Sequence, residues 1–323
     1  MSRDLVVALS GGIGGAKLAL GLSRIVEPDN LIVVANVGDD FEHLGLSISP
    51  DADTLTYTLA GLDNTKLGWG RRDETWSFME TLTALGGEDW FRLGDRDLAI
   101  HVERTHRLRR GESLSAIIAD FCRRLGVGPR VLPVTDDRLR TRLRTDEGWL
   151  DFQDYFVRLQ CRPAVLELAF EGSEEARPHP DLLAALRDER LRAVVICPSN
   201  PFISVEPILA VKGMRQALSA CAAPVVAVSP IIGGRAVKGP TAKMMTELGM
   251  NPSAAAVAML YTDLIDGYVM DAEDAEEAAH VAARVTLAPT LMTSLAERER
   301  LARVVLEAAD ALASSKRGRG FAA

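Results

Sequence analysis

Four aspartates close together near the N-terminus have the chemistry to bind a metal ion: Asp39, Asp40, Asp51 and Asp53. Carboxylate oxygens suit Mg²⁺, which usually takes one or two carboxylates and completes its shell with water and substrate phosphates. Alternatively, Asp51 and Asp53 cap a helix while Asp39 and Asp40 form a turn. Beside a phosphate-binding loop, the metal is the better interpretation. We therefore expect all four aspartates at a Mg²⁺ site.

A glycine-rich turn precedes these aspartates and could supply that phosphate-binding loop. It contains four glycines and a lysine: Gly11, Gly12, Gly14, Gly15 and Lys17. Glycines let the backbone approach a ligand closely, and the N-terminus of the following helix presents free N–H groups to an anion. The alternative is close packing of helix on strand without a ligand. The turn is not a nicotinamide-dinucleotide fingerprint, because Lys17 stands where a third glycine is expected, and it is not a Walker A loop.

A loop between two tryptophans is the next candidate binding segment. Trp69 and Trp76 flank Arg71, Arg72 and Asp73 in a chain with only 5% aromatic residues. Exposed aromatic rings in a glycine-containing loop suit stacking on a flat ligand. The alternative is that the tryptophans pin the loop to the core.

A second anion site is expected further along the chain, around Gly233, Gly234 and Lys238, where a Gly-Pro-Thr sequence begins a helix at Thr241. The sequence offers no convincing pair of nucleophile and base. This favours a direct displacement that depends on positioning and a metal ion.

The elements that must position these residues alternate between strand and helix. Apolar runs at 5–9, 31–36, 193–197 and 224–229 predict buried parallel strands, and each ends in a polar or glycine-rich segment. Ligands of open α/β sheets bind outside the carboxyl ends of the strands. We expect an α/β, Rossmann-like fold: a mostly parallel, doubly wound sheet with helices on both faces. The expected parts are residues 1–129 and 172–314 as the core, 130–171 as a small inserted strand-rich α+β lobe, and 315–323 as a disordered tail.

Composition excludes several classes of function. The net charge of −8 argues against a general nucleic-acid binder. The basic stretch 104–110 is local, and we expect it to be a solvent-exposed helix face. No apolar run approaches the roughly 18 residues of a membrane span. The four scattered cysteines suit reduced thiols in the cytoplasm.

Taken together, the motifs resemble the 2-phospho-L-lactate transferase family of coenzyme F420 biosynthesis, most closely its bacterial members. The matching segments follow in order at 10–17, 36–40, 50–54, 57–61, 68–76, 93–99, 198–201, 229–234 and 238–239. A related glycine-rich-start family of nucleotide-sugar-binding regulators shares the opening turn, and it is the alternative. The loop 68–76 is not expected in such a regulator.

The resemblance implies a reaction of two small molecules. The terminal ribityl hydroxyl of the deazaflavin Fo attacks the distal phosphorus of a GDP-linked donor that carries 2-phospholactate, phosphoenolpyruvate or 3-phosphoglycerate. GMP leaves, Mg²⁺ is required, and F420-0 or its dehydro form results. The resemblance also implies a homodimer, to which the apolar helices near 254–264 would contribute.

The resemblance also assigns roles to residues. Asp40, with Asp39, would act on the attacking hydroxyl. Fo would lie against Asp40 and the tryptophan loop, with contacts from Trp69, Arg71, Arg72 and Asp73. Ser199 and Asn200 would lie near the nucleotide, whose diphosphate the glycine turn and the loop with Gly233, Gly234 and Lys238 would hold.

Overall fold

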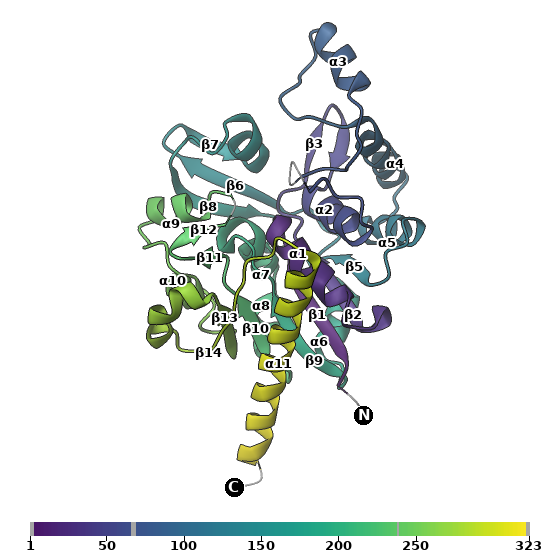
Figure 1. Ribbon diagram of the computed structural model, residues 1–323. Coiled ribbons are helices and arrows are strands. Elements are labelled where there is room, and N and C mark those ends of the chain that lie inside the picture. Colours follow the sequence, from purple (N-terminus) through teal and green to yellow (C-terminus); the bar gives the residue numbers. More distant parts are fainter. Residues whose placement is uncertain (1–2, 66–68, 238, 321–323) are drawn as a thin grey trace.

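The structure is a computed structural model that describes residues 3–65, 69–237 and 239–320, with only the backbone for 315–320. Seven parallel strands form its central sheet, in the order β14-β13-β10-β9-β1-β2-β5 (Figure 1). They are β1 (Leu5–Ser10), β2 (Leu31–Ala35), β5 (Arg130–Pro133), β9 (Leu191–Ile196), β10 (Val225–Val228), β13 (Gly267–Met270) and β14 (Arg284–Leu287). β1 and β2 are buried along their whole length, as expected of apolar strands covered on both faces.

Helices cover both faces of this sheet. Val6 and Ala8 of β1 pack in one core with α1 (Gly12–Ser23), α2 (Pro50–Leu59), α5 (Leu114–Arg124) and α11 (Leu295–Gly320). Val7 and Leu9 point to the other core, formed with α6 (Pro180–Leu186), α7 (Glu206–Ala210), α8 (Met214–Ser219) and α10 (Ala254–Met259). Alternate residues of one strand therefore supply the two cores. The predicted doubly wound α/β fold is confirmed.

The order of the strands reverses at β1, which lies between β2 and β9. Such a switch point opens a crevice beyond the carboxyl ends of the strands. The glycine turn follows β1, Asn36 follows β2 and Pro198 follows β9. These segments therefore meet at one edge of the sheet, as the sequence predicts.

Two smaller units flank this edge (Figure 1). One contains β3 (Phe41–His43), β4 (Leu46–Ile48), α3 (Ser77–Ala84) and α4 (Asp95–Arg109). The other is an antiparallel sheet in the order β7-β6-β8, made of β6 (Arg140–Thr145), β7 (Gly148–Asp151) and β8 (Val165–Glu171), with the π-helix η2 (Asp154–Arg158). It corresponds to the expected inserted lobe, although β5 pairs with β2 in the main sheet. The lobe sheet therefore begins at Arg140.

The remaining elements are short: η1 (Pro28–Asn30), η3 (Pro201–Val205), β11 (Ile231–Ile232), β12 (Arg235–Ala236), α9 (Thr241–Glu247) and η4 (Ala272–His280). The C-terminal helix α11 continues to Gly320, well into the segment expected to be disordered, and residues 321–323 lie outside the described part. Within the described residues, no helix combines the length and apolar character that crossing a membrane requires.

Candidate active site

The aspartate segment and the glycine turn meet through two side chains. Asp51, in the first turn of α2, accepts a hydrogen bond from the Gly12 N–H, with 2.6 Å between N and Oδ1. The buried Asn36 amide, just after β2, donates to Asp51 Oδ2 at 2.9 Å and also to Asp39 Oδ1. A single Nδ2 therefore holds Asp39 and Asp51 side by side next to the turn.

Burial raises the pKa values of Asp39, Asp40 and Asp51. It raises the pKa of Asp39 well above its ordinary value, and the Asp51 charge raises it further. Burial also raises the pKa of Asp51 to about 6 and that of Asp40 to about 7, although Arg140 and the Ser49 hydroxyl oppose the shift at Asp40. Asp40 Oδ1 is buried and has no hydrogen-bond partner among the described residues. Asp39 and Asp51, which the Asn36 amide holds side by side, could supply the one or two carboxylates that Mg²⁺ usually takes.

Asp53 has a basic partner of its own. It forms a buried ion pair with Arg104 of α4, whose side chain is fully enclosed. Residues two apart on a helix do not face the same side, so Asp51 and Asp53 reach different neighbours. The aspartates expected at one site therefore have different partners: Asn36 holds Asp39 and Asp51, and Arg104 holds Asp53. The charges of Asp53 and Arg104 both act on Asp40. The basic stretch expected to be solvent-exposed begins with this buried Arg104.

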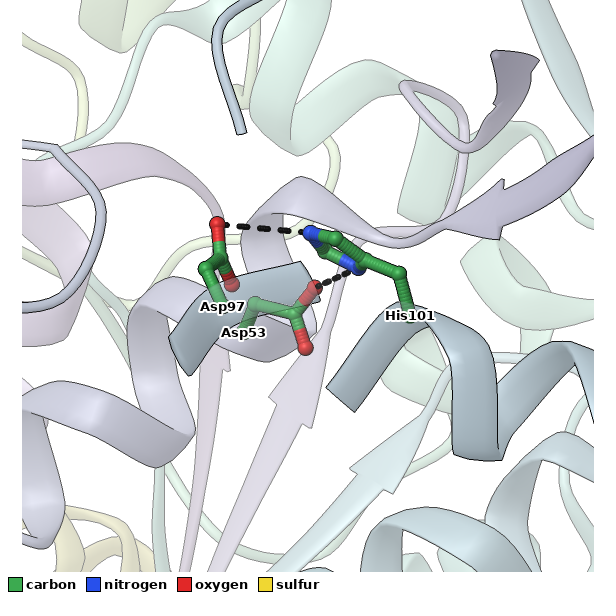
Figure 2. A group of neighbouring side chains, drawn as sticks. All are labelled: Asp53, Asp97 and His101. Carbon is green, nitrogen blue, oxygen red and sulfur yellow. Dashed lines mark ion pairs between the residues drawn. The ribbon is translucent and has the colours of Figure 1, made fainter. Parts of the chain in front are cut away.

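A second group of side chains surrounds His101 of α4. Figure 2 shows Asp53 opposite its Nδ1, at 3.7 Å, and Asp97 opposite its Nε2, at 3.3 Å. One ligand atom from each residue lies within 4.8 Å of the others, so the group could hold a metal ion. However, the carboxylates lie at different ring nitrogens, and Arg104 already neutralises Asp53. A cation here would lie beside a guanidinium group, which disfavours metal binding by these three side chains.

Sequence reasoning did not identify His101 or Arg104 as parts of this region. The available signal was their spacing: Asp97, His101 and Arg104 recur at helical intervals on one face of α4. Tyr57 of α2 extends the group, because its hydroxyl donates to Asp97. The group fastens α4 to the helix that carries Asp51.

The glycine turn packs tightly against the end of β9. A Cβ on Gly14 would overlap the Pro198 carbonyl oxygen, and one on Gly15 would overlap the hydroxyls of Ser10 and Ser199. Ser199 Oγ donates to the Gly11 carbonyl at 2.8 Å. Ser199, expected near the nucleotide, therefore lies at the turn. Asn200 instead accepts the Phe202 N–H at 2.9 Å and caps η3.

Other residues expected at the donor have partners within the protein. Lys17 Nζ donates to the Met292 carbonyl at 2.9 Å. The N–H groups of Gly233 and Gly234 each donate to the Asp274 carboxylate at 3.1 Å. A phosphate at this turn would have to replace Asp274. Lys238 lies outside the described residues.

The two tryptophans of the loop differ in their surroundings. Trp69 suits stacking on a ligand, and Trp76 suits a role in pinning the loop. Trp69 is 47% exposed and available to a flat ligand, whereas the Arg92 guanidinium covers the Trp76 ring at 4.3 Å from its centroid. Both tryptophans line a small cavity together with Arg71, whose Nε is buried with no hydrogen-bond partner in the described part of the chain. Arg72 and Asp73, by contrast, are exposed and pair with each other at 3.8 Å.

The chain was compared with known proteins. Residues 6–308 match the family model described as 2-phospho-L-lactate transferase CofD. The phosphoenolpyruvate transferase of Kitasatospora aureofaciens is 42% identical over 317 residues, covering 94% of this chain and 98% of the relative. The 2-phospho-L-lactate transferase of Methanocaldococcus jannaschii is 36% identical, covering 94% of this chain and 97% of the relative. A crystal structure of a UPF0052-family protein from Bacillus halodurans covers 95% of this chain and 99% of its own, with a TM-score of 0.63 at 14% identity, a likeness of fold alone.

Proposed function

The chain belongs to the 2-phospho-L-lactate transferase CofD family of coenzyme F420 biosynthesis, and we propose that it transfers a phosphorylated three-carbon acid from a GDP-linked donor to Fo. The observation that carries this proposal is the hydrogen bond between Asp51 and the Gly12 N–H. It brings acidic side chains to a turn suited to phosphate, as a displacement at phosphorus requires.

We assign the steps of the reaction to residues as follows. The terminal ribityl oxygen of Fo bonds to the distal phosphorus, the bond from that phosphorus to GMP breaks, and Asp40 takes the hydroxyl proton. A carboxylate with a pKa of about 7 is suited to a general base near neutral pH. Mg²⁺ held by Asp39 and Asp51, next to Asp40, would offset the negative charge that develops on the phosphate of the leaving GMP. Asp53 takes no part in these steps, because it is paired with Arg104.

The acid is proposed to be phosphoenolpyruvate, because the bacterial relative at 42% identity carries that name and the archaeal one, at 36%, is named for 2-phospho-L-lactate. Mass spectrometry of the product from each GDP-linked donor distinguishes the acids, since dehydro-F420-0 differs from F420-0 by two hydrogens. A homodimer and a cytoplasmic location remain predictions, and light scattering of the purified chain checks the first.

Binding of Fo tests the transferase directly. Quenching of deazaflavin fluorescence by the purified chain, followed by release of GMP when donor and Mg²⁺ are added, is the expected result. Asp40→Asn should remain folded, still quench Fo and lose turnover, because the proton acceptor is gone. A wild-type chain that neither binds Fo nor releases GMP would overturn the proposal. It would instead favour the nucleotide-sugar-binding regulator.

A further inference from the structure

The inserted lobe contacts the segment that carries Asp39 and Asp40. The Thr141 N–H of β6 donates to the Gly38 carbonyl at 2.8 Å, and Gln153 Nε2 donates to the Asp39 carbonyl at 3.1 Å. A Cβ on Gly38 would lie 2.6 Å from Thr141 Oγ1. The first residues of β6 therefore form one wall of the candidate site.

Three arginines alternate along β6 on the side opposite its buried residues: Arg140, Arg142 and Arg144. Two of them have acidic partners. Arg142 pairs with Asp151 at 2.8 Å, and Arg144 pairs with Glu167 at 2.7 Å. These pairs neutralise the far part of the strand.

Arg140, at the end of β6 nearest the site, differs from the other two. Among the described residues, no carboxylate lies within 4.0 Å of its guanidinium, and its Nη1 donates to the Leu139 carbonyl at 2.7 Å. Its side chain is partly buried, and the acidic group that acts on it most strongly is Asp40. A guanidinium group without an ion pair beside a reaction centre is suited to an anionic substrate group, which it can bind through two parallel N–H groups.

We propose that Arg140 binds an anionic group of the transferred acid, either its carboxylate or its distal phosphate. This inference rests on the proposed transferase function. The leaving GMP lies with the glycine turn in that mechanism, whereas Asp40 and Arg140 lie at the transferred end. The inserted lobe thereby contributes a substrate-binding residue to a site whose other proposed residues belong to the glycine turn and the aspartate segment.

Steady-state kinetics of Arg140→Gln test the proposal, with Arg144→Gln as the matched control on the same face of the same strand. Loss of a charge-assisted hydrogen-bond pair should raise the donor KM about 10- to 100-fold, while the Fo KM stays the same. Arg140→Lys should recover part of the loss, because it restores the charge but not the two-pronged geometry. Binding of GMP, which lacks both the acid and the distal phosphate, should be unchanged, and thermal melting verifies folding.

A donor analogue without the carboxylate separates the two possible groups. If Arg140 binds the carboxylate, wild type and Arg140→Gln should use this analogue equally well. If it binds the distal phosphate, the variant should still be weaker. Equal donor KM values for Arg140→Gln and Arg144→Gln, in an assay where wild type makes product, would overturn the role of Arg140. Absence of product with wild type would instead overturn the proposed function.

Discussion

The Asp51 carboxylate accepts a hydrogen bond from the Gly12 N–H at the N-terminus of α1, with 2.6 Å between the two atoms. An anionic side chain therefore lies where a helix N-terminus favours negative charge. A donor phosphate at the turn would compete for the same N–H group. A cation that draws Asp51 toward Asp39 would free the Gly12 N–H group for that phosphate. Binding of the metal and binding of the nucleotide should therefore be coupled.

That coupling can be measured with GDP as the probe. Mg²⁺ should increase the affinity of the wild-type chain for GDP about tenfold, within the usual range of coupling between two sites. Asp51→Asn should lose most of this increase, because its side chain no longer carries the charge that binds the cation. Calorimetric titrations with Mg²⁺ and with EDTA provide the comparison. An equal Mg²⁺ effect in both proteins would remove Asp51 from the metal site.

The stability of the metal-free protein should depend on pH through Asp40. Burial raises the folded pKa of Asp40 from 3.8 to about 7, so the folded state keeps a proton that the unfolded state releases. The contribution is therefore complete below about pH 4 and is lost as pH rises through about 7, at a cost of at most roughly 4 kcal/mol. Asp40→Asn cannot ionise, and it should lose less stability than wild type between about pH 5 and about pH 8.

Denaturant unfolding in EDTA at the two pH values measures this difference. The exposed Asp29→Asn is the control for the chemical change itself, and it should follow wild type. Parallel pH dependences for wild type and Asp40→Asn would contradict a raised pKa of Asp40 in the folded protein.

The sequence was sufficient to predict the sheet and the edge where the site lies. Uninterrupted apolar runs identify buried parallel strands, and the carboxyl ends of such strands must meet, which brings Gly12 and Asn36 together. The division of the aspartates was not predictable. Asp53 pairs with Arg104, far along the chain, and a basic stretch gives no sign that its first member is buried. Arg140 was missed for the same reason, because only the fold brings it to Asp40.

The buried pair of Arg104 and Asp53 should be essential for stability. Arg104→Leu leaves the Asp53 charge enclosed without its guanidinium partner, and we expect the free energy of unfolding to fall by about 3–5 kcal/mol. The double variant Asp53→Leu/Arg104→Leu should recover part of the loss, because the uncompensated charge is also removed. Arg123→Leu, which breaks an exposed pair with Asp120, should cost only about 0–1 kcal/mol.

Urea unfolding of the four proteins supplies these free energies. A loss for Arg104→Leu no larger than that for Arg123→Leu would contradict the essential role of the pair. It would also reopen Asp53 as a metal ligand beside His101, where Figure 2 places it.

Alanine substitutions separate the two roles of the glycine turn, close packing and phosphate binding. At Gly14 a Cβ would meet the Pro198 carbonyl, which is backbone and cannot move aside, so Gly14→Ala should cost about 1–3 kcal/mol of stability. Gly128→Ala, far from the site, is the packing control, because its Cβ meets only the Pro28 side chain at 3.2 Å.

Gly12 has φ +62° but open space around its Cβ, with Ser204 Oγ nearest at 3.7 Å. Gly12→Ala should therefore strain the turn that presents the N–H group and weaken GDP binding beyond its effect on stability. Unchanged GDP affinity in a folded Gly12→Ala protein would leave the turn with a packing role alone.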